Sequence, residues 1–262
     1  MNFEWSKYKR VFTFGCSFTS YYWPTWADVV FQETPQAELY NFARAGSGNL
    51  MITARIAEAN NRYKFNETDL VLVMFTTPTR EDRWIERDGG WIPLGNIYNQ
   101  DRYSKEWVKE FADERGYLIR DHALVDMALT YLETVPCDSY CMPSTPLVVN
   151  AEKPNQFDKV LHGDIAELYS VRMSRLPKSF YECSHPYPKE YQSNQIKFGD
   201  GHPSTMMYYL YLKNIGFNLS DKTEQYAKES TEKLFKITDR NDCFKVFKEC
   251  DDRTSVMHKA LY

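Results

Sequence analysis

Short apolar runs alternate with helical patterns along the first third of the chain. Residues 11–14, 37–43 and 69–75 have the apolar, β-prone composition of strands. The third run is almost unbroken in its hydrophobicity, which indicates a strand covered on both faces, as in a parallel sheet. Three β-then-α units within 80 residues, joined by short turns, predict a three-layer, doubly wound α/β domain with a mostly parallel sheet.

The middle of the chain is less regular. The Asp-Gly-Gly sequence at 88–90, inside residues 83–93, is typical of a hairpin at the edge of a sheet. Apolar positions at helical spacing predict helices over 104–111 and about 117–133. Residues 137–142 predict a short fourth strand.

Clear patterns return only near the C-terminus. Residues 144–195 predict loops, with one helix near 158–169. Ser204 is placed to cap a further helix that Gly216 ends. The charged sequence from Ser220 onward predicts another helix, either a solvated surface helix or a contact between subunits of a homo-oligomer.

Chain length and composition narrow the class of protein. We expect an α/β domain over residues 1–218, with an irregular insertion at about 84–195, followed by a helical extension over 219–262. The net charge of −4, with both signs mixed, gives no sign of nucleic-acid binding.

The sequence also bears on the compartment. No apolar run approaches the roughly 18 residues that span a bilayer, so no membrane association is expected. The first residues lack the apolar core of a secretory signal. Six cysteines in 262 residues are too sparse for a disulfide framework. We therefore expect a cytoplasmic protein with reduced cysteines.

Four loops carry residues with useful chemistry. In a doubly wound sheet, the loops at the carboxyl ends of the strands converge on one crevice. The loops are Gly15-Cys16-Ser17, the turn at Gly46, the turn after Phe75, and Asp200-Gly201-His202.

Brought together, these loops would form an acyl-transfer site. Ser17 would be the nucleophile, His202 its general base and Asp200 the residue that orients the base. The backbone N–H groups of Ser17 and Gly46 would stabilise an oxyanion.

The residues and their order resemble the SGNH/GDSL hydrolase superfamily, which comprises esterases, lipases and carbohydrate deacetylases on a flavodoxin-like three-layer fold. The matching blocks are Gly15-Cys16-Ser17-Phe18-Thr19, the segment from Asn41 to Gly46, and Asp200-Gly201-His202-Pro203. The resemblance covers roughly residues 11–216 and implies a nucleophile at Ser17, an oxyanion glycine at Gly46 and a catalytic histidine at His202. The wording of the first block and of Pro-Thr-Trp-Ala-Asp looks like members carried by tailed phages, cyanophages in particular.

Three positions depart from the superfamily pattern. Cys16 replaces the aspartate of the first block. In the third block, Pro78 stands where the pattern has an asparagine that donates to the oxyanion, so that donor is either missing or replaced by Thr77, Thr79 or Arg80. Asp200 lies two residues before the histidine instead of three, at which position the chain has Gly199.

Several candidate residues also have other interpretations. Ser17 could instead cap a helix, and Cys16 could be the nucleophile or a small buried side chain. Arg80 and Glu81 are placed either to touch substrate or to form an exposed ion pair. Two further groups of residues could either pack in the core or form a site. A zinc site would use Cys137, Cys141, Cys183 and His185. A sugar-binding groove would use Trp84, Trp91 and Tyr98.

Two hypotheses about function follow. The first is a serine esterase or deacetylase that removes a small acyl group, such as acetyl, from a carbohydrate or similar ester, with no metal or organic cofactor. The second is a catalytically silent SGNH-like domain that serves a phage as a structural or host-interaction protein, in the host cytoplasm or in the virion.

Overall fold

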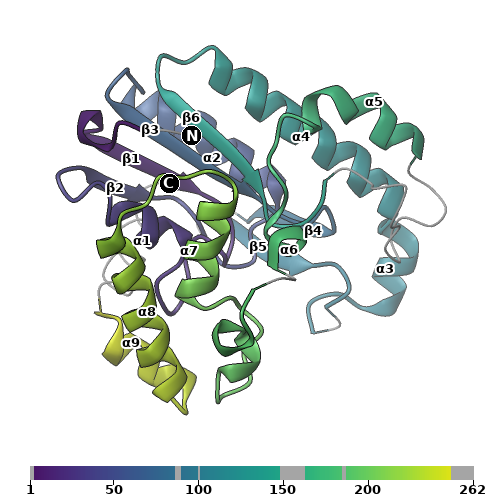
Figure 1. Ribbon diagram of the computed structural model, residues 1–262. Coiled ribbons are helices and arrows are strands. Elements are labelled where there is room, and N and C mark those ends of the chain that lie inside the picture. The colour runs from purple at the N-terminus through teal and green to yellow at the C-terminus, as the bar shows by residue number, and fades with distance from the viewer. Residues whose placement is uncertain (1–2, 86–89, 100, 148–162, 185–186, 249–262) are drawn as a thin grey trace.

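The computed structural model describes residues 3–85, 90–99, 101–147, 163–184 and 187–248. At its centre lies a four-stranded sheet whose strands are parallel and follow the order β2-β1-β3-β6 (Figure 1). The strands are β1 (Arg10–Phe14), β2 (Glu38–Asn41), β3 (Asp69–Phe75) and β6 (Asp138–Pro143). Helices cover both faces of the sheet, so the predicted three-layer α/β class is confirmed.

The strand register brings the carboxyl ends of the strands to one edge of the sheet. Thr13, near the end of β1, pairs with Asn41 at the end of β2. At the opposite edge, Arg10 and Asp69 form an ion pair of 2.6 Å between the first residues of β1 and β3. Every residue of β3 is buried, which agrees with its unbroken apolar sequence.

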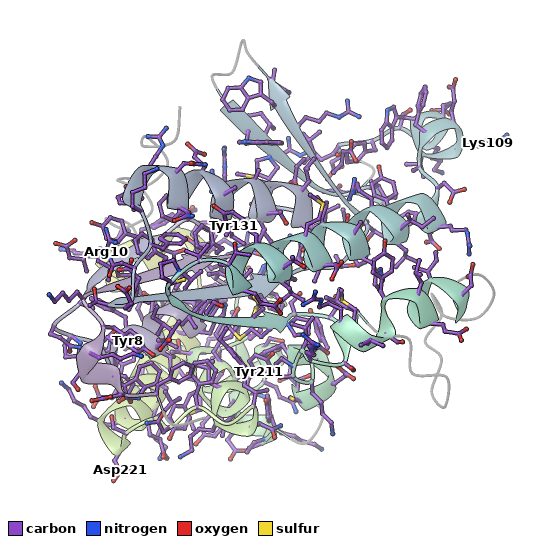
Figure 2. All side chains as sticks on the ribbon, turned by 90° about the horizontal axis from the view of Figure 1, so that it is seen from above. Tyr8, Arg10, Lys109, Tyr131, Tyr211 and Asp221 are labelled. Atoms are coloured by element: carbon purple, nitrogen blue, oxygen red, sulfur yellow. The ribbon has the colours of Figure 1, made fainter. Side chains whose placement is uncertain are left out.

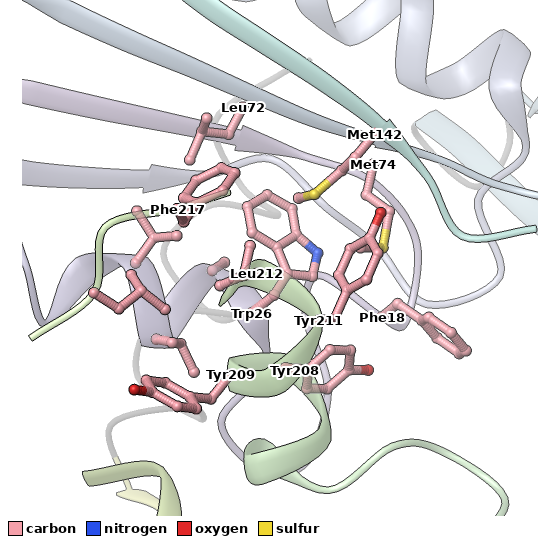
Figure 3. Packing of buried hydrophobic residues seen from close by; sticks show 14 of the residues in the cluster. Phe18, Trp26, Leu72, Met74, Met142, Tyr208, Tyr209, Tyr211, Leu212 and Phe217 are labelled. Atoms are coloured by element: carbon pink, nitrogen blue, oxygen red, sulfur yellow. The ribbon is translucent and has the colours of Figure 1, made fainter. Parts of the chain in front are cut away.

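One face of the sheet packs against α1 (Trp26–Phe31), α7 (Thr205–Asn214) and α8 (Asp221–Lys236). Figure 3 shows Trp26 and Tyr211 reaching from α1 and α7 toward the strands. Neither side chain is exposed, and burial of a side chain of this size contributes about 2–3 kcal/mol. The strand residues that they approach are Leu72, Met74 and Met142.

The other face packs against α2 (Asn49–Tyr63), α4 (Glu114–Glu133) and α5 (Gly163–Met173), and Figure 2 shows α2 and α4 side by side above the strands. The apolar face predicted for α4 is the one that it buries. It comprises Val125, Ala128 and Leu132, with Leu129 partly buried beside them.

A two-stranded antiparallel hairpin, β4 (Arg80–Ile85) and β5 (Gly90–Asn96), follows β3 and leads to α3 (Lys105–Phe111). The predicted hairpin is therefore present, although residues 86–89 of its turn lie outside the described residues. Asp82 joins the hairpin to α2, because its carboxylate accepts hydrogen bonds from the N–H groups of Gly48 and Met51 at 2.8 and 2.9 Å. The stretch 84–195 also contains α4 and β6, which belong to the central layers.

Three helix predictions need correction. The sequence of residues 23–30 predicts the start of a helix at Trp23. α1 instead begins at Trp26, because Thr25 lies before the first turn and its N–H donates to the carboxylate of Asp28 at 2.8 Å. α5 ends at Met173, four residues beyond the predicted helix, of which residues 158–162 lie outside the described part. The helix α6 (Phe180–Ser184) has only five residues, too few for a periodic pattern to reveal it.

The C-terminal extension packs on the domain. α8 buries Ala227 and Leu234, and Glu224 and Lys228 form an ion pair of 2.5 Å at a spacing of four residues, which supports the helix. Within the described residues, every helix is too short or too polar to cross a bilayer. The remaining elements are η1 (Trp5–Lys7), η3 (Lys189–Tyr191), η4 (Ser193–Gln195), η5 (Arg240–Asp242) and α9 (Cys243–Val246).

Candidate active site

The turn after β1 holds Ser17 at the carboxyl edge of the sheet. The carbonyl of Cys16 accepts hydrogen bonds from the N–H groups of Thr19 and Ser20 at 2.9 and 3.2 Å, which closes the turn. Gly15 is required because a Cβ atom there would lie 2.0 Å from Oγ1 of Thr19. This tight turn directs the chain away from β1 and leaves Ser17 6% exposed.

The loop before α7 brings His202 to the same edge. Ser204 caps α7 as predicted, because its hydroxyl accepts from the N–H of Met207 at 3.4 Å and donates to the carbonyl of Tyr191 at 2.6 Å. Trp23 ties this loop to the first one, since its indole N–H donates to the carbonyl of Pro203 at 2.9 Å. Two segments about 180 residues apart are thus held side by side.

Ser17, His202 and Asp200 form a continuous chain of hydrogen-bond contacts. Nε2 of His202 lies 2.9 Å from Oγ of Ser17, and Nδ1 lies 2.8 Å from Oδ1 of Asp200. The N–H of His202 also donates to Oδ1 of Asp200 at 2.9 Å. This backbone contact folds the carboxylate back toward the imidazole, so a spacing of two residues is sufficient for the contact that the pattern makes with three.

Asp200 is held in its charged form. Burial alone would raise the pKa of its carboxyl, but the hydrogen bonds from His202 and Tyr21 lower the pKa well below its usual value. The hydroxyl of Tyr21 donates to Oδ2 at 2.8 Å, and Nη2 of Arg240 lies 2.5 Å from the same oxygen. The ring of Tyr21 stacks on the imidazole of His202, with centroids 3.8 Å apart and an interplanar angle of 21°.

The Ser17–His202 contact opens into a cavity of about 450 Å³. A second hollow of about 220 Å³ shares Tyr181 and Gly201 with the first. Two arginines and three aromatic side chains stand beside the serine and the histidine. The cavity is lined by Ser17, Phe18, Tyr21, Arg80, Tyr181, Gly199, Asp200, Gly201, His202 and Arg240.

Of the four residues expected to bind the oxyanion or substrate, only Arg80 lines this cavity. Gly46 has a φ of 87°, and a Cβ atom there would approach the carbonyl of Pro93 at 3.3 Å, so this side of the turn faces the hairpin. Thr79 is turned to the hairpin, since its hydroxyl accepts from the side-chain amide of Asn96 at 2.9 Å. The hydroxyl of Thr77 lies 3.4 Å from that of Thr79.

Arg80 is half-buried and engaged on one side. Its Nη1 donates to the carbonyl of Ser47 at 3.0 Å, which holds the guanidinium against the turn that contains Gly46. Its Nε is buried and meets no acceptor among the described residues. Its charge also opposes the rise that burial causes in the pKa of the Asp82 carboxyl. Arg80 therefore brings a positive charge to the cavity.

A buried polar cluster fixes the turn after β3. The side chain of Asn49, the first residue of α2, accepts from the N–H of Thr76 and donates to its carbonyl, both at 2.9 Å. It also donates to Asp121 of α4 at 2.9 Å. Burial raises the pKa of Asp121 to about 7, against the opposing effects of the ion pair with Arg120 and the hydrogen bond from Asn49.

The other candidate residues lie away from the cavity. Glu81 is bound to α4, with its carboxylate 2.8 Å from the hydroxyl of Tyr117 and 3.2 Å from Nη1 of Arg120. The two hairpin tryptophans contact each other edge to face at a centroid distance of 6.1 Å, and Tyr98 donates to Glu114. The sugar groove was predicted from three aromatic residues, and none of them lines the Ser17 cavity: Trp84, Trp91 and Tyr98.

The five described cysteines are free thiols, four of them buried and Cys137 partly buried. Cys16 lies in the hydrophobic core, so His202 meets the hydroxyl of Ser17 and not the thiol. Burial raises the pKa of the Cys137 and Cys141 thiols to about 12 each. His185 lies outside the described residues, and among those described no group of three metal-ligating side chains occurs.

Three residues at the site are absent from the sequence-based predictions. Tyr21 lies four residues after Ser17, and this closeness to the nucleophile turn is the signal that could have pointed to it. Tyr181 lies on the short helix α6, and Arg240 belongs to the extension, so only the tertiary fold brings them to the cavity.

Comparisons with known proteins find likenesses among solved structures. No family model matches the chain, and the search of curated proteins finds no match. A mutant of an acetyl-xylooligosaccharide esterase from Geobacillus is 14% identical, with a TM-score of 0.46, over 82% of this chain and 98% of that one. A protein assigned to the lipolytic G-D-S-L family from Desulfitobacterium hafniense is 15% identical, with a TM-score of 0.43, over 85% and 99%.

A third structure, an alpha/beta hydrolase enzyme from the metagenome of Lake Arreo in Spain, is 14% identical, with a TM-score of 0.41, over 79% of this chain and 95% of that one. These neighbours are hydrolases by description. At such identities and scores the likeness carries no argument about chemistry, so the function has to be argued from the geometry of the site.

Proposed function

We propose that this protein is a serine ester hydrolase of SGNH type. The observation that carries the proposal is the unbroken contact chain from Oγ of Ser17 through the imidazole of His202 to the carboxylate of Asp200, beside a cavity of about 450 Å³. A hydroxyl, a base and an orienting carboxylate at these distances form the arrangement that acyl transfer requires.

The reaction proceeds in two halves. Oγ of Ser17 attacks the ester carbonyl while Nε2 of His202 takes its proton, and the imidazolium is stabilised through Nδ1–H by Asp200. The tetrahedral intermediate releases the alcohol, which receives that proton, and leaves an acyl-serine. Water, deprotonated by His202, then attacks the acyl-serine. The bond from the acyl carbon to Oγ breaks, the carboxylic acid leaves, and His202 returns the proton to Oγ of Ser17.

The backbone N–H groups of Ser17 and Gly46 would hold the developing oxyanion. Within the described residues, no backbone hydrogen bond occupies either group. The hydroxyl of Thr79 is bound to Asn96 of the hairpin. We assign the third donor to Arg80, which lines the cavity, in preference to Thr77 and Thr79, which are absent from its lining. A guanidinium placed there would compensate for the proline in the third block by adding charge where the transition state needs it.

The substrate would be a small acyl ester. The cavity beside Ser17 has room for an acetyl group, and the adjoining hollow of about 220 Å³ could receive part of the alcohol. Polar lining residues, among them Gln192 and Ser193, suit a hydroxylated alcohol such as a carbohydrate.

The test compares p-nitrophenyl acetate hydrolysis by the wild type and by Ser17→Ala. We expect kcat/KM to fall at least about 1000-fold, because the nucleophile is removed. Ser20→Ala, a serine of the same turn, is the matched control and should stay within about threefold of the wild type. Equal rates for wild type and Ser17→Ala would instead favour a catalytically silent domain.

A further inference from the structure

The C-terminal extension supplies a side chain to the candidate active site. Arg240 lies in η5, beyond α8, and Nη2 of its guanidinium is 2.5 Å from Oδ2 of Asp200. The two carboxylate oxygens are thus divided between partners, with Oδ1 facing His202 and Oδ2 facing Arg240 and Tyr21. Arg240 also lines the Ser17 cavity.

Hydrophobic packing of the extension against the domain fixes the position of Arg240. Trp23, which is 1% exposed, lies in one hydrophobic cluster with Leu234 and Phe247, so the extension covers the segment that follows the nucleophile turn. The guanidinium of Arg240 lies 5.6 Å from the ring centroid of Tyr22, and that ring contacts Phe244 of α9 at 4.8 Å. Such packing limits the side-chain freedom that makes an exposed ion pair weak.

The carboxylate of Asp200 needs an external partner on this side. Its Oδ1 is fixed by the backbone N–H of His202 in a turn of only two residues. A partial rotation about the Cβ–Cγ bond would take Oδ1 out of line with Nδ1 and weaken that contact. Arg240 and Tyr21, both bound to Oδ2, oppose that rotation.

We infer that Arg240 is a positioning residue that the extension contributes to the Ser17–His202–Asp200 site. This inference rests on the proposed function for its catalytic meaning. Arg240 holds Asp200 in the rotamer that meets His202, and its positive charge opposes that of a protonated His202. The extension is thereby a part of the active site and not an appendage to the domain.

The positive charge of Arg240 disfavours a second positive charge on the nearby imidazole of His202. Loss of the guanidinium leaves the carboxylate unopposed, which favours the imidazolium and moves the acidic limb of the kcat/KM profile to higher pH. The titratable or charged groups that face Asp200 and His202 from the surrounding elements are Ser17 and Tyr21 from the nucleophile turn, Arg80 from β4, Tyr181 from α6, Tyr208 from α7, and Arg240 and Cys243 from the extension.

The experiment follows the imidazole signal of His202 by nitrogen NMR as a function of pH, and needs no turnover. In Arg240→Gln we expect the midpoint to rise by roughly 0.5–1 unit, as a partly exposed charge at this range would produce. Arg240→Lys keeps the charge and should return the midpoint to within about 0.2 unit of the wild type. Lys245→Gln removes a positive charge from the same extension, at a residue paired with Asp242, and should leave the midpoint unchanged.

The same variants are then assayed for ester hydrolysis. Arg240→Gln should lose about tenfold in kcat at its optimum with KM nearly constant, because the base is mispositioned and substrate binding is not. Arg240→Met provides a second neutral replacement if the glutamine variant folds poorly, and the other histidine signals report whether the fold is retained.

The outcomes separate the two proposals. A folded neutral variant with both an unchanged His202 midpoint and an unchanged kcat would overturn the role of Arg240. A raised midpoint in a protein without any Ser17-dependent hydrolysis would support the role of Arg240 and reject the proposed function.

Discussion

At the scale of single residues, the site depends on how each polar group is occupied. Asp200 uses both oxygens, and Ser17 and His202 use each other, so few of these groups can rearrange without losing a partner. Arg80 differs, because Nη1 is bound to Ser47 while Nε is buried without an acceptor among the described residues. It lines the cavity and has donor capacity left for a substrate.

Arg80→Gln tests that capacity. We expect kcat for a neutral ester to fall about 100-fold with little change in KM, since a donor to the transition state is lost. Arg83→Gln is the matched control, because Arg83 lies on the same strand, has a side chain 44% exposed and is absent from the cavity lining. If KM rises by a larger factor than kcat falls, Arg80 would instead act in binding the substrate in its ground state.

At the scale of elements, two short connections determine where the reacting groups lie. The turn after β1 depends on one glycine, and the loop before α7 depends on one helix cap. Each connection places a reacting side chain within a few residues of a rigid strand or helix. Changes in either should therefore affect stability and activity together.

Gly15→Ala should disrupt the nucleophile turn. The new Cβ would lie 2.0 Å from Oγ1 of Thr19, which itself accepts from the indole of Trp26 at 3.1 Å and cannot move freely. We expect a loss of about 3 kcal/mol in the free energy of unfolding, measured by denaturant titration. Gly116→Ala in α4, where the nearest atom is 3.8 Å away, should instead stabilise the protein by about 0.5–1 kcal/mol.

Ser204→Ala should weaken the α7 cap. The hydroxyl is fully buried and bonds both to the N–H of Met207 and to the carbonyl of Tyr191, so we expect a loss of about 2 kcal/mol. Ser104→Ala removes the exposed cap of α3, remote from the site, and should cost about 0.5–1 kcal/mol. Equal losses in the two variants would contradict the role assigned to the buried contact with Tyr191.

At the scale of the whole molecule, the buried cluster around Asp121 couples the fold to pH. Burial raises the pKa of this carboxyl to about 7, so between about pH 4 and 7 the folded state binds a proton that the unfolded state has released. The contribution of Asp121 to stability therefore falls as the pH rises through this window. The cluster joins α2, α4 and the end of β3, so ionisation of Asp121 lowers the free energy of unfolding of the whole domain.

Asp121→Asn should remove this pH dependence. Relative to the wild type, the free energy of unfolding of the variant should improve between pH 5 and about pH 7 and then level off, whatever its value at the lower pH. Asp126→Asn, on the same helix and 38% exposed, should show no such trend. Denaturant titrations of the three proteins at several pH values measure the slope, and a flat difference for Asp121→Asn would refute the assignment.

The sequence predicted the central architecture because the pattern there is local. The β1 and β3 runs, the helical periodicity of α4 and the cap at Ser204 are each legible within a few residues. The contact of Ser17 with His202 was also predicted, from two loops at the carboxyl edge of one sheet. Arg240 was not, because its place depends on how the extension packs across Trp23, a contact far apart in the sequence.

The candidate oxyanion donors also depend on tertiary contacts that the sequence does not reveal. Thr77 and Thr79 were candidates because they follow β3, but the hairpin that begins at Arg80 takes up the hydroxyl of Thr79 through Asn96. The hairpin was predicted to begin at residue 83, so this competition for the hydroxyl could not be anticipated. Only Arg80 keeps a place in the cavity.

The most direct test of the central proposal is covalent labelling by a fluorophosphonate probe, located by peptide mass spectrometry. A hydroxyl activated by the imidazole of His202 should react, so we expect one label, on the peptide that contains Ser17, and none in Ser17→Ala or His202→Ala. A wild-type protein that is folded and stays unlabelled, or that carries the label on another residue, would contradict the proposal that Ser17 is an activated nucleophile.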